Sequence, residues 1–70
     1  MLPLAFANEG EEAVIRQIRG TPQVKQHLAD LGFVAGGCVR VVSRFGGNVI
    51  VNVKEARVAI SAELAQKIMV

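Results

Sequence analysis

His27 and Cys38 carry the most reactive side chains in the sequence, since an imidazole and a thiol together could bind a transition metal or act as a nucleophilic pair. They are the only histidine and the only cysteine in the chain. A structural zinc site needs about four ligands, and a nucleophilic pair needs a third residue to orient its base. We therefore predict no catalytic residue, no metal site and no resident cofactor. His27 and Cys38 are the only candidates for metal ligation.

The size and charge of the chain restrict its possible roles. Its 70 residues carry eight basic and six acidic side chains, a formal net charge of +2, and form one domain, residues 1–70. A lone cysteine cannot form a disulfide within the chain, which favours a reducing cytoplasm. The apolar stretch before Asn8 is too short for a signal peptide or a membrane span. We expect a cytoplasmic domain without membrane insertion, whose small core could be supplemented by a homo-oligomer or a partner.

A short helix is predicted in the first half of the chain. It begins at Thr21-Pro22, a favourable N-cap followed by a favourable first helical residue, and runs to about Leu31. Gly32 then suits a left-handed C-terminal cap, after which Phe33 would pack back onto Leu28. The apolar stripe of this helix consists of Val24, Leu28 and Leu31.

Alternating apolar and polar residues predict short strands. These strands cover residues 12–19, 38–45, 48–53 and 57–60. The alternation slips once in the first strand, as a β-bulge would cause. Ser61 would cap a second helix containing Leu64 and Ile68, and Met69-Val70 would add a last strand beside the first. We predict a mostly β protein with short helices: a small, partly open SH3-like β-barrel, with one helix after the first strand and a short helix before the last.

Side-chain parity decides how the second and third of these strands pair. The predicted core residues of the second strand are Val39, Val41, Ser43 and Phe45. A two-residue loop, Gly46-Gly47, would place Arg44 opposite Val49 and mix core and solvent faces. We therefore predict a three-residue loop ending at Asn48, or an equivalent bulge, which pairs Phe45 with Val49.

The glycines are predicted to serve structural turns. A phosphate-binding loop would continue into a Lys-Ser/Thr pair and open a helix, whereas Gly36-Gly37 leads into a strand. The predicted structural turn residues are Gly32, Gly36, Gly37, Gly46 and Gly47.

Basic and apolar side chains are predicted to share the solvent face of these strands, with Arg40 and Lys54 as cross-strand neighbours. Such a mixed surface is typical of protein docking, unless Leu2, Leu4 or Phe6 folds over it. The candidates for this partner interface are Arg40, Val42, Arg44 and Ile50. Nucleic-acid binding is disfavoured, because the basic residues are few and no Phe is expected on the outward face.

Three segments together resemble the FeoA family over nearly the whole chain. They are Gln26-His-Leu28-Ala-Asp-Leu31-Gly32-Phe-Val-Ala-Gly36, Arg57-Val-Ala-Ile60 and Ala65-Gln-Lys-Ile68-Met-Val70. Two positions depart from the family pattern. Ala35 stands where the family often has Pro, and Lys54-Glu55 stands where a glycine turn is common.

The resemblance implies a small cytoplasmic accessory protein of ferrous-iron uptake, not an enzyme, that binds the membrane GTPase transporter FeoB. Two alternatives are open. One is an SH3-like interaction or dimerisation module of a metal-dependent regulator, although 70 residues leave no room for the helix-turn-helix domain that such a repressor needs. The other is a small metal chaperone that uses Cys38 and His27.

Overall fold

Six strands and three helical segments build the fold, which the computed structural model describes over residues 1–70. The strands are β1 (Glu12–Val14), β2 (Gln17–Ile18), β3 (Cys38–Phe45), β4 (Asn48–Val53), β5 (Ala56–Ser61) and β6 (Ile68–Met69). The helical segments are a 3-10 turn, η1 (Leu4–Phe6), and two α-helices, α1 (Pro22–Asp30) and α2 (Ala62–Ala65). None of the helices is long and apolar enough to cross a membrane.

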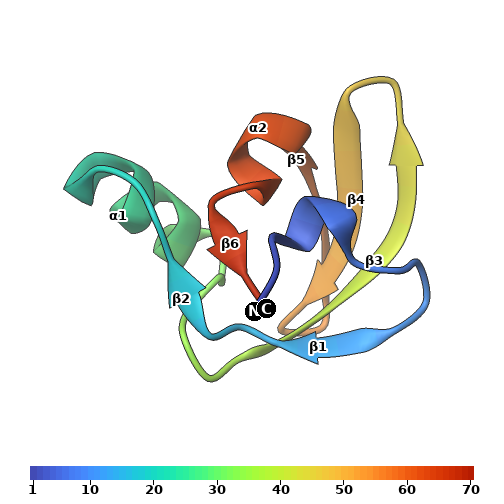
Figure 1. Cartoon of the computed structure of the whole chain (residues 1–70), viewed down its shortest axis with the longest axis horizontal. Helices are drawn as coiled ribbons and strands as arrows, with labels where there is room; N and C mark the ends of the chain where they lie inside the picture. Colours follow the sequence, from blue (N-terminus) through green and yellow to red (C-terminus); the bar gives the residue numbers. More distant parts are fainter.

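The strands form two sheets, a four-stranded sheet in the order β1-β3-β4-β5 and a pair, β2-β6. In Figure 1 the larger sheet curves around one side of the molecule, and α1 projects on the other side. The predicted fold class, mostly β with short helices and SH3-like, is confirmed. The sheets stay open and do not close into a barrel.

The first helix has both predicted caps. The Thr21 side chain accepts a hydrogen bond from a backbone N–H of the first turn, and Gly32 has φ 108°. The N–H groups of Phe33 and Gly32 donate to the carbonyls of Leu28 and Ala29, both at 2.9 Å. These are the two bonds of a Schellman cap. Phe33 and Leu28 are fully buried in one cluster, so the cap joins the helix to the core.

The predicted first strand is two strands, because the chain changes sheets at Ile15-Arg16. The Ile15 N–H donates to the carbonyl of Gly37, which precedes β3, at 2.8 Å. The Arg16 N–H donates to the carbonyl of Met69 in β6 at 2.7 Å. The slip in alternation therefore marks a crossover rather than a bulge. The predicted last strand beside the first is confirmed as β6, which pairs with β2.

The second helix is shorter than predicted. Ser61 caps it, since its Oγ accepts the Leu64 N–H at 3.1 Å. The helix ends at Ala65, so Ile68 lies on β6 and pairs with Ile18. The spacing of four between Leu64 and Ile68 is typical of a helix that buries both residues. Ile68 is instead buried as part of the strand β6.

The predicted three-residue loop between β3 and β4 is wrong, and the bulge occurs instead. Gly46-Gly47 form a two-residue loop that pairs Phe45 with Asn48 and Arg44 with Val49. The register shifts between Val41 and Ser43, which leaves Val42 as the extra residue of a bulge. The residues of β3 therefore exchange faces after Val42.

This bulge keeps the predicted valine rows in the core but removes Phe45 from it. Val39 pairs with Val53 and Val41 with Val51, and all four side chains are buried. Phe45 is 78% exposed, so its prediction as a core residue is wrong. The predicted pairing of Arg40 with Lys54 is wrong for the same reason: Arg40 pairs with Asn52.

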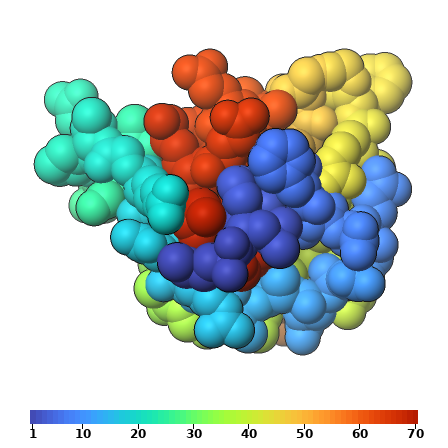
Figure 2. Space-filling view, in the orientation of Figure 1, coloured from blue at the N-terminus to red at the C-terminus, as the bar shows by residue number.

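The N-terminal segment enters the core instead of covering the outward face. Leu4 is fully buried, and the backbones of Leu2 and Val70 exchange hydrogen bonds of 2.9 and 2.8 Å. Figures 1 and 2 show the two ends of the chain side by side on one face of the molecule.

Replacing Glu55 by glycine should raise the free energy of unfolding by about 1 kcal/mol. Lys54 and Glu55 form the turn between β4 and β5 with φ values of 49° and 64°, and Val53 pairs with Ala56 across it. Both turn residues thus adopt a backbone conformation that favours glycine. Chemical denaturation would measure the gain. Glu55→Ala is the matched control and should give no gain, since alanine has the same backbone strain.

Candidate functional site

Alternation places one set of side chains on the solvent side of the four-stranded sheet, which we call the outer sheet face. Cross-strand pairs fix its membership: Glu12 lies opposite Arg40, Arg40 opposite Asn52, and Asn52 opposite Arg57. The face consists of Glu12, Val14, Cys38, Arg40, Ser43, Phe45, Asn48, Ile50, Asn52, Arg57, Ala59 and Ser61. Charged and apolar side chains are therefore mixed on one continuous surface.

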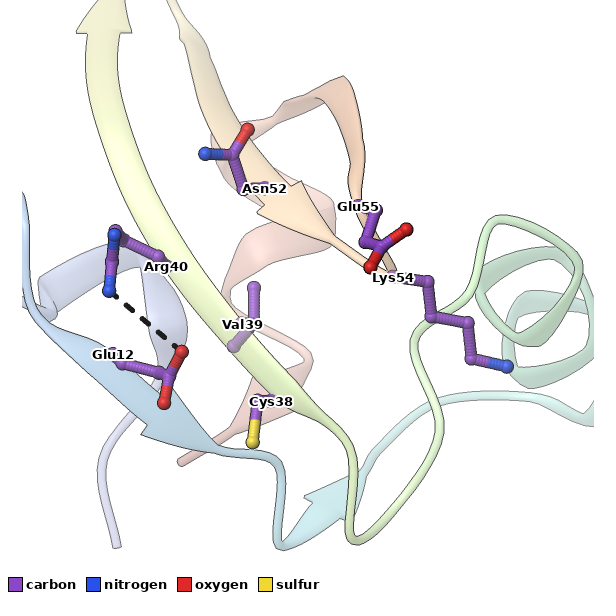
Figure 3. A pocket seen from close by; sticks show the side chains of 7 residues that line it. All are labelled: Glu12, Cys38, Val39, Arg40, Asn52, Lys54 and Glu55. Atoms are coloured by element: carbon purple, nitrogen blue, oxygen red, sulfur yellow. Dashed lines mark ion pairs between the residues drawn. The ribbon is translucent and has the colours of Figure 1, made fainter.

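A shallow pocket of about 330 Å³ lies at one end of this face. Figure 3 shows Arg40 and Glu12 pointing toward each other from β3 and β1, at a distance of 3.9 Å between Arg40 Nη2 and Glu12 Oε2. The Lys54 side chain extends away from both of them. Because the Arg40 and Glu12 side chains are 51% and 61% exposed, solvent screens this ion pair and both remain available to a partner.

The structure does not bring the two metal-ligand candidates into one site. Cys38 is exposed and lines the pocket on the outer sheet face. His27 is an exposed residue of α1 and does not line that pocket. No group of three or more His, Cys, Asp or Glu side chains lies close enough to hold a metal ion.

Arg44 does not share the outer sheet face with Arg40, because the bulge turns its side chain to the face of Val49. Its Nη2 atom donates to the carbonyl oxygens of Ala5, at 2.9 Å, and of Ala7. Its Nη1 atom lies 3.7 Å from Oε1 of Glu9. Arg44 therefore holds the N-terminal segment against the hairpin of β3 and β4.

The two apolar candidates of the predicted interface lie near the middle of the sheet. Ile50 belongs to the outer sheet face and pairs with Ser43 and Ala59. Val42 is the extra residue of the bulge. Both side chains are half-buried, so each keeps part of its apolar surface in contact with solvent.

Two of the three phenylalanines are exposed, contrary to the expectation that none faces outward. Phe6 and Phe45 are 68% and 78% exposed, and both line a hollow of about 300 Å³ beside the Gly46-Gly47 loop. Phe45 is exposed because of the bulge, and Phe6 because the 3-10 turn buries Leu4 instead. The absence of aromatic platforms therefore no longer counts against nucleic-acid binding, although the modest positive charge still does.

Residues 2–70 match the model of the FeoA domain family. The chain belongs to the FeoA family. It is 40% identical over 70 residues to a Methanocaldococcus jannaschii protein named "Putative Fe(2+) transport protein A", and the match covers all of this chain and 85% of that protein.

Solved structures also resemble this FeoA-family chain. The crystal structure of an iron uptake regulatory protein, FeoA, has a TM-score of 0.90 and 26% identity, covering 97% of this chain and 92% of the other. A manganese-dependent transcriptional repressor has a TM-score of 0.84 and 26% identity, but the match covers 94% of this chain and only 38% of the repressor. The same fold thus occurs as most of a small protein and as part of a larger regulator.

Sequence reasoning missed most members of the outer sheet face in this FeoA-family chain, three of which show why. Arg57, Val14 and Glu12 were not among the interface candidates, yet they lie in the same surface as Arg40 and Ile50. The pairing of β4 with β5 follows from the two-residue turn at Lys54-Glu55, and the correct turn length would have placed Arg57 beside Asn52.

Proposed function

We propose that this protein is a non-catalytic, cytoplasmic accessory protein of ferrous-iron uptake that docks onto an FeoB-like membrane GTPase transporter. Family membership over residues 2–70 supports the transport role. The observation that carries the docking role is the outer sheet face, where a row of charged and polar side chains lies between rows that contain partly exposed apolar ones. Protein interfaces commonly combine apolar contacts with polar ones.

We assign the docking surface to Arg40, Val42 and Ile50, and add Arg57 because it lies in the same row as Arg40. Arg44, the fourth residue of the predicted interface, supports this surface indirectly. Its guanidinium binds the carbonyls of Ala5 and Ala7, so a substitution there would change the N-terminal segment as well as any contact with a partner.

Binding to the cytoplasmic GTPase domain of the transporter should weaken about 10-fold or more in Arg40→Glu and in Ile50→Glu. The first variant reverses a charge on the outer sheet face, and the second places a charge at a half-buried apolar position of the interior strand β4. Isothermal titration calorimetry with purified proteins measures the change. Arg19→Glu is the matched control for Arg40→Glu, because Arg19 is exposed outside the four-stranded sheet and the change in net charge is identical. Unchanged affinity in both outer-face variants would refute this surface.

A further inference from the structure

The strand β5 forms a free edge of the four-stranded sheet, because it pairs only with β4. A two-residue turn makes Val53 and Ala56 a hydrogen-bonded pair, and the antiparallel pattern then alternates along the strand. Arg57 and Ala59 consequently direct their backbone N–H and C=O groups away from β4. No turn, loop or cap hydrogen bond uses the backbone of either residue.

This edge lacks the features that protect most edge strands from pairing. The segment from Ala56 to Ser61 contains no proline or glycine, and its register with β4 is unbroken over all six pairs. Its one charged side chain, Arg57, lies on the outer sheet face, so it does not block a second strand from pairing with the backbone at this edge. Edge strands are normally blocked by bulges, prolines or charges that point inward. The opposite edge of the sheet, β1, has only three residues.

Val58 shows that the core is incomplete at this edge. Its side chain points to the inner side of the sheet, opposite the buried Val51, but it is only half-buried. Ile60, two residues along the same face, is 3% exposed. A further strand beside β5 would cover Val58 and accept the free backbone groups.

We propose that the β5 edge pairs antiparallel with β5 of a second copy of this chain, with Val58 on the two-fold axis. In this register Arg57 faces Ala59 of the second copy, and each such pair exchanges both of its backbone hydrogen bonds. All the free N–H and C=O groups of Arg57 and Ala59 are thereby used. The two Val58 side chains meet on the inner face, so the four-stranded sheets continue into each other.

The charge distribution favours a second copy as the occupant of this edge. Arg57 faces the uncharged Ala59 rather than another arginine, so the symmetric pair opposes no like charges. A short chain with a core cluster of 12 residues also gains from extending its sheet. An edge-strand contact buries less area than a standard interface, so we expect a weak dimer with a dissociation constant of about 100 μM.

Substitutions at Ala59 give effects of opposite sign. Ala59 is exposed on the outer sheet face, so Ala59→Glu and Ala59→Lys should leave the monomer fold, followed by circular dichroism, unchanged. In the dimer, the glutamate faces Arg57 of the second copy and should strengthen association about five-fold, whereas the lysine should weaken it about five-fold. Sedimentation equilibrium over a concentration series measures both. Adding Arg57→Ala to Ala59→Glu should remove the gain.

Ala59→Pro tests the backbone pairing itself. Proline removes an N–H that is unbonded in the monomer, and edge strands tolerate this change, but the dimer loses the bond. We expect a folded protein that no longer dimerises. A wild-type chain that stays monomeric up to about 1 mM overturns the proposal. So does a dimer unaffected by Ala59→Pro, or a shift in the same direction for Ala59→Glu and Ala59→Lys, which would place Ala59 opposite itself.

Discussion

A Phe33→Ala variant should lose about 3–5 kcal/mol of the free energy of unfolding, enough to leave much of the protein unfolded. Phe33 is fully buried and is the largest of the fully buried side chains. It directly follows the glycine cap of α1, and its N–H closes the Schellman motif on Leu28. Truncation therefore leaves a cavity where the helix joins the core, and the short α1 has few other buried side chains to hold it in place.

Urea denaturation, followed by far-ultraviolet circular dichroism, measures this loss. The adjacent residue supplies the control: Val34 is 37% exposed, so Val34→Ala should change the free energy of unfolding by about 0.5 kcal/mol or less. Phe33→Leu should cost less than Phe33→Ala, because it keeps most of the buried volume. A loss below about 1.5 kcal/mol in Phe33→Ala would mean that the site collapses around the cavity and that α1 is held by other contacts.

An Arg44→Ala variant should lose about 2 kcal/mol of the free energy of unfolding and release the segment from Ala5 to Glu9 from its contact with β3. The Arg44 guanidinium donates to two carbonyls of the N-terminal segment and lies near Glu9. Hydrogen bonds from a charged donor are worth more than neutral ones, but the Arg44 side chain is 35% exposed, so solvent screening reduces the contribution of Glu9. Most of the loss should therefore come from the two carbonyls.

Hydrogen exchange detects the release, since amides of the N-terminal segment should exchange faster in Arg44→Ala while those of β4 keep their relative protection. Arg44→Lys should show an intermediate loss, because an ammonium lacks the forked geometry that reaches both carbonyls. Arg19→Ala is the control at an exposed arginine without a side-chain hydrogen bond to the protein. Equal effects of Arg44→Ala and Arg19→Ala would contradict a specific role for Arg44.

Local patterns predicted much of this fold because the chain follows them closely. Periodicity predicted the bounds of β3 and β4 and the buried valines. Capping preferences predicted the two ends of α1, at Thr21 and Gly32. Each of these features depends on residues close together in the sequence. That is why no knowledge of the tertiary structure was needed to place them.

The errors arose where a distant segment decides the outcome. Two adjacent valines, Val41 and Val42, both fit the apolar row, and only their pairing with β4 shows which of them is the extra residue. That choice determines the faces of Arg44 and Phe45. The N-terminal segment has no clear period, so neither the burial of Leu4 nor its attachment through Arg44 could be predicted from the sequence.

The candidate site was predicted only in part for the same reason. Arg40 and Ile50 lie on the outward face as expected, because neither side chain is turned by the bulge. Arg40 precedes Val42 in β3, and Ile50 belongs to β4, which has no extra residue. Arg57 joins them only through the pairing of β4 with β5, which depends on the length of an unusual turn. The character of the surface could thus be predicted, but its full membership could not.

The backbone pairing of Leu2 with Val70 joins the two ends of the chain by two hydrogen bonds. Leu2 and Val70 supply each other's hydrogen-bond partners, so neither of them can fray independently. Opening the N-terminal segment removes a neighbour from β6, and β6 is the only partner of β2. The smaller sheet therefore depends in part on the contact between the two ends, and a disturbance there reaches the strand that leads into α1.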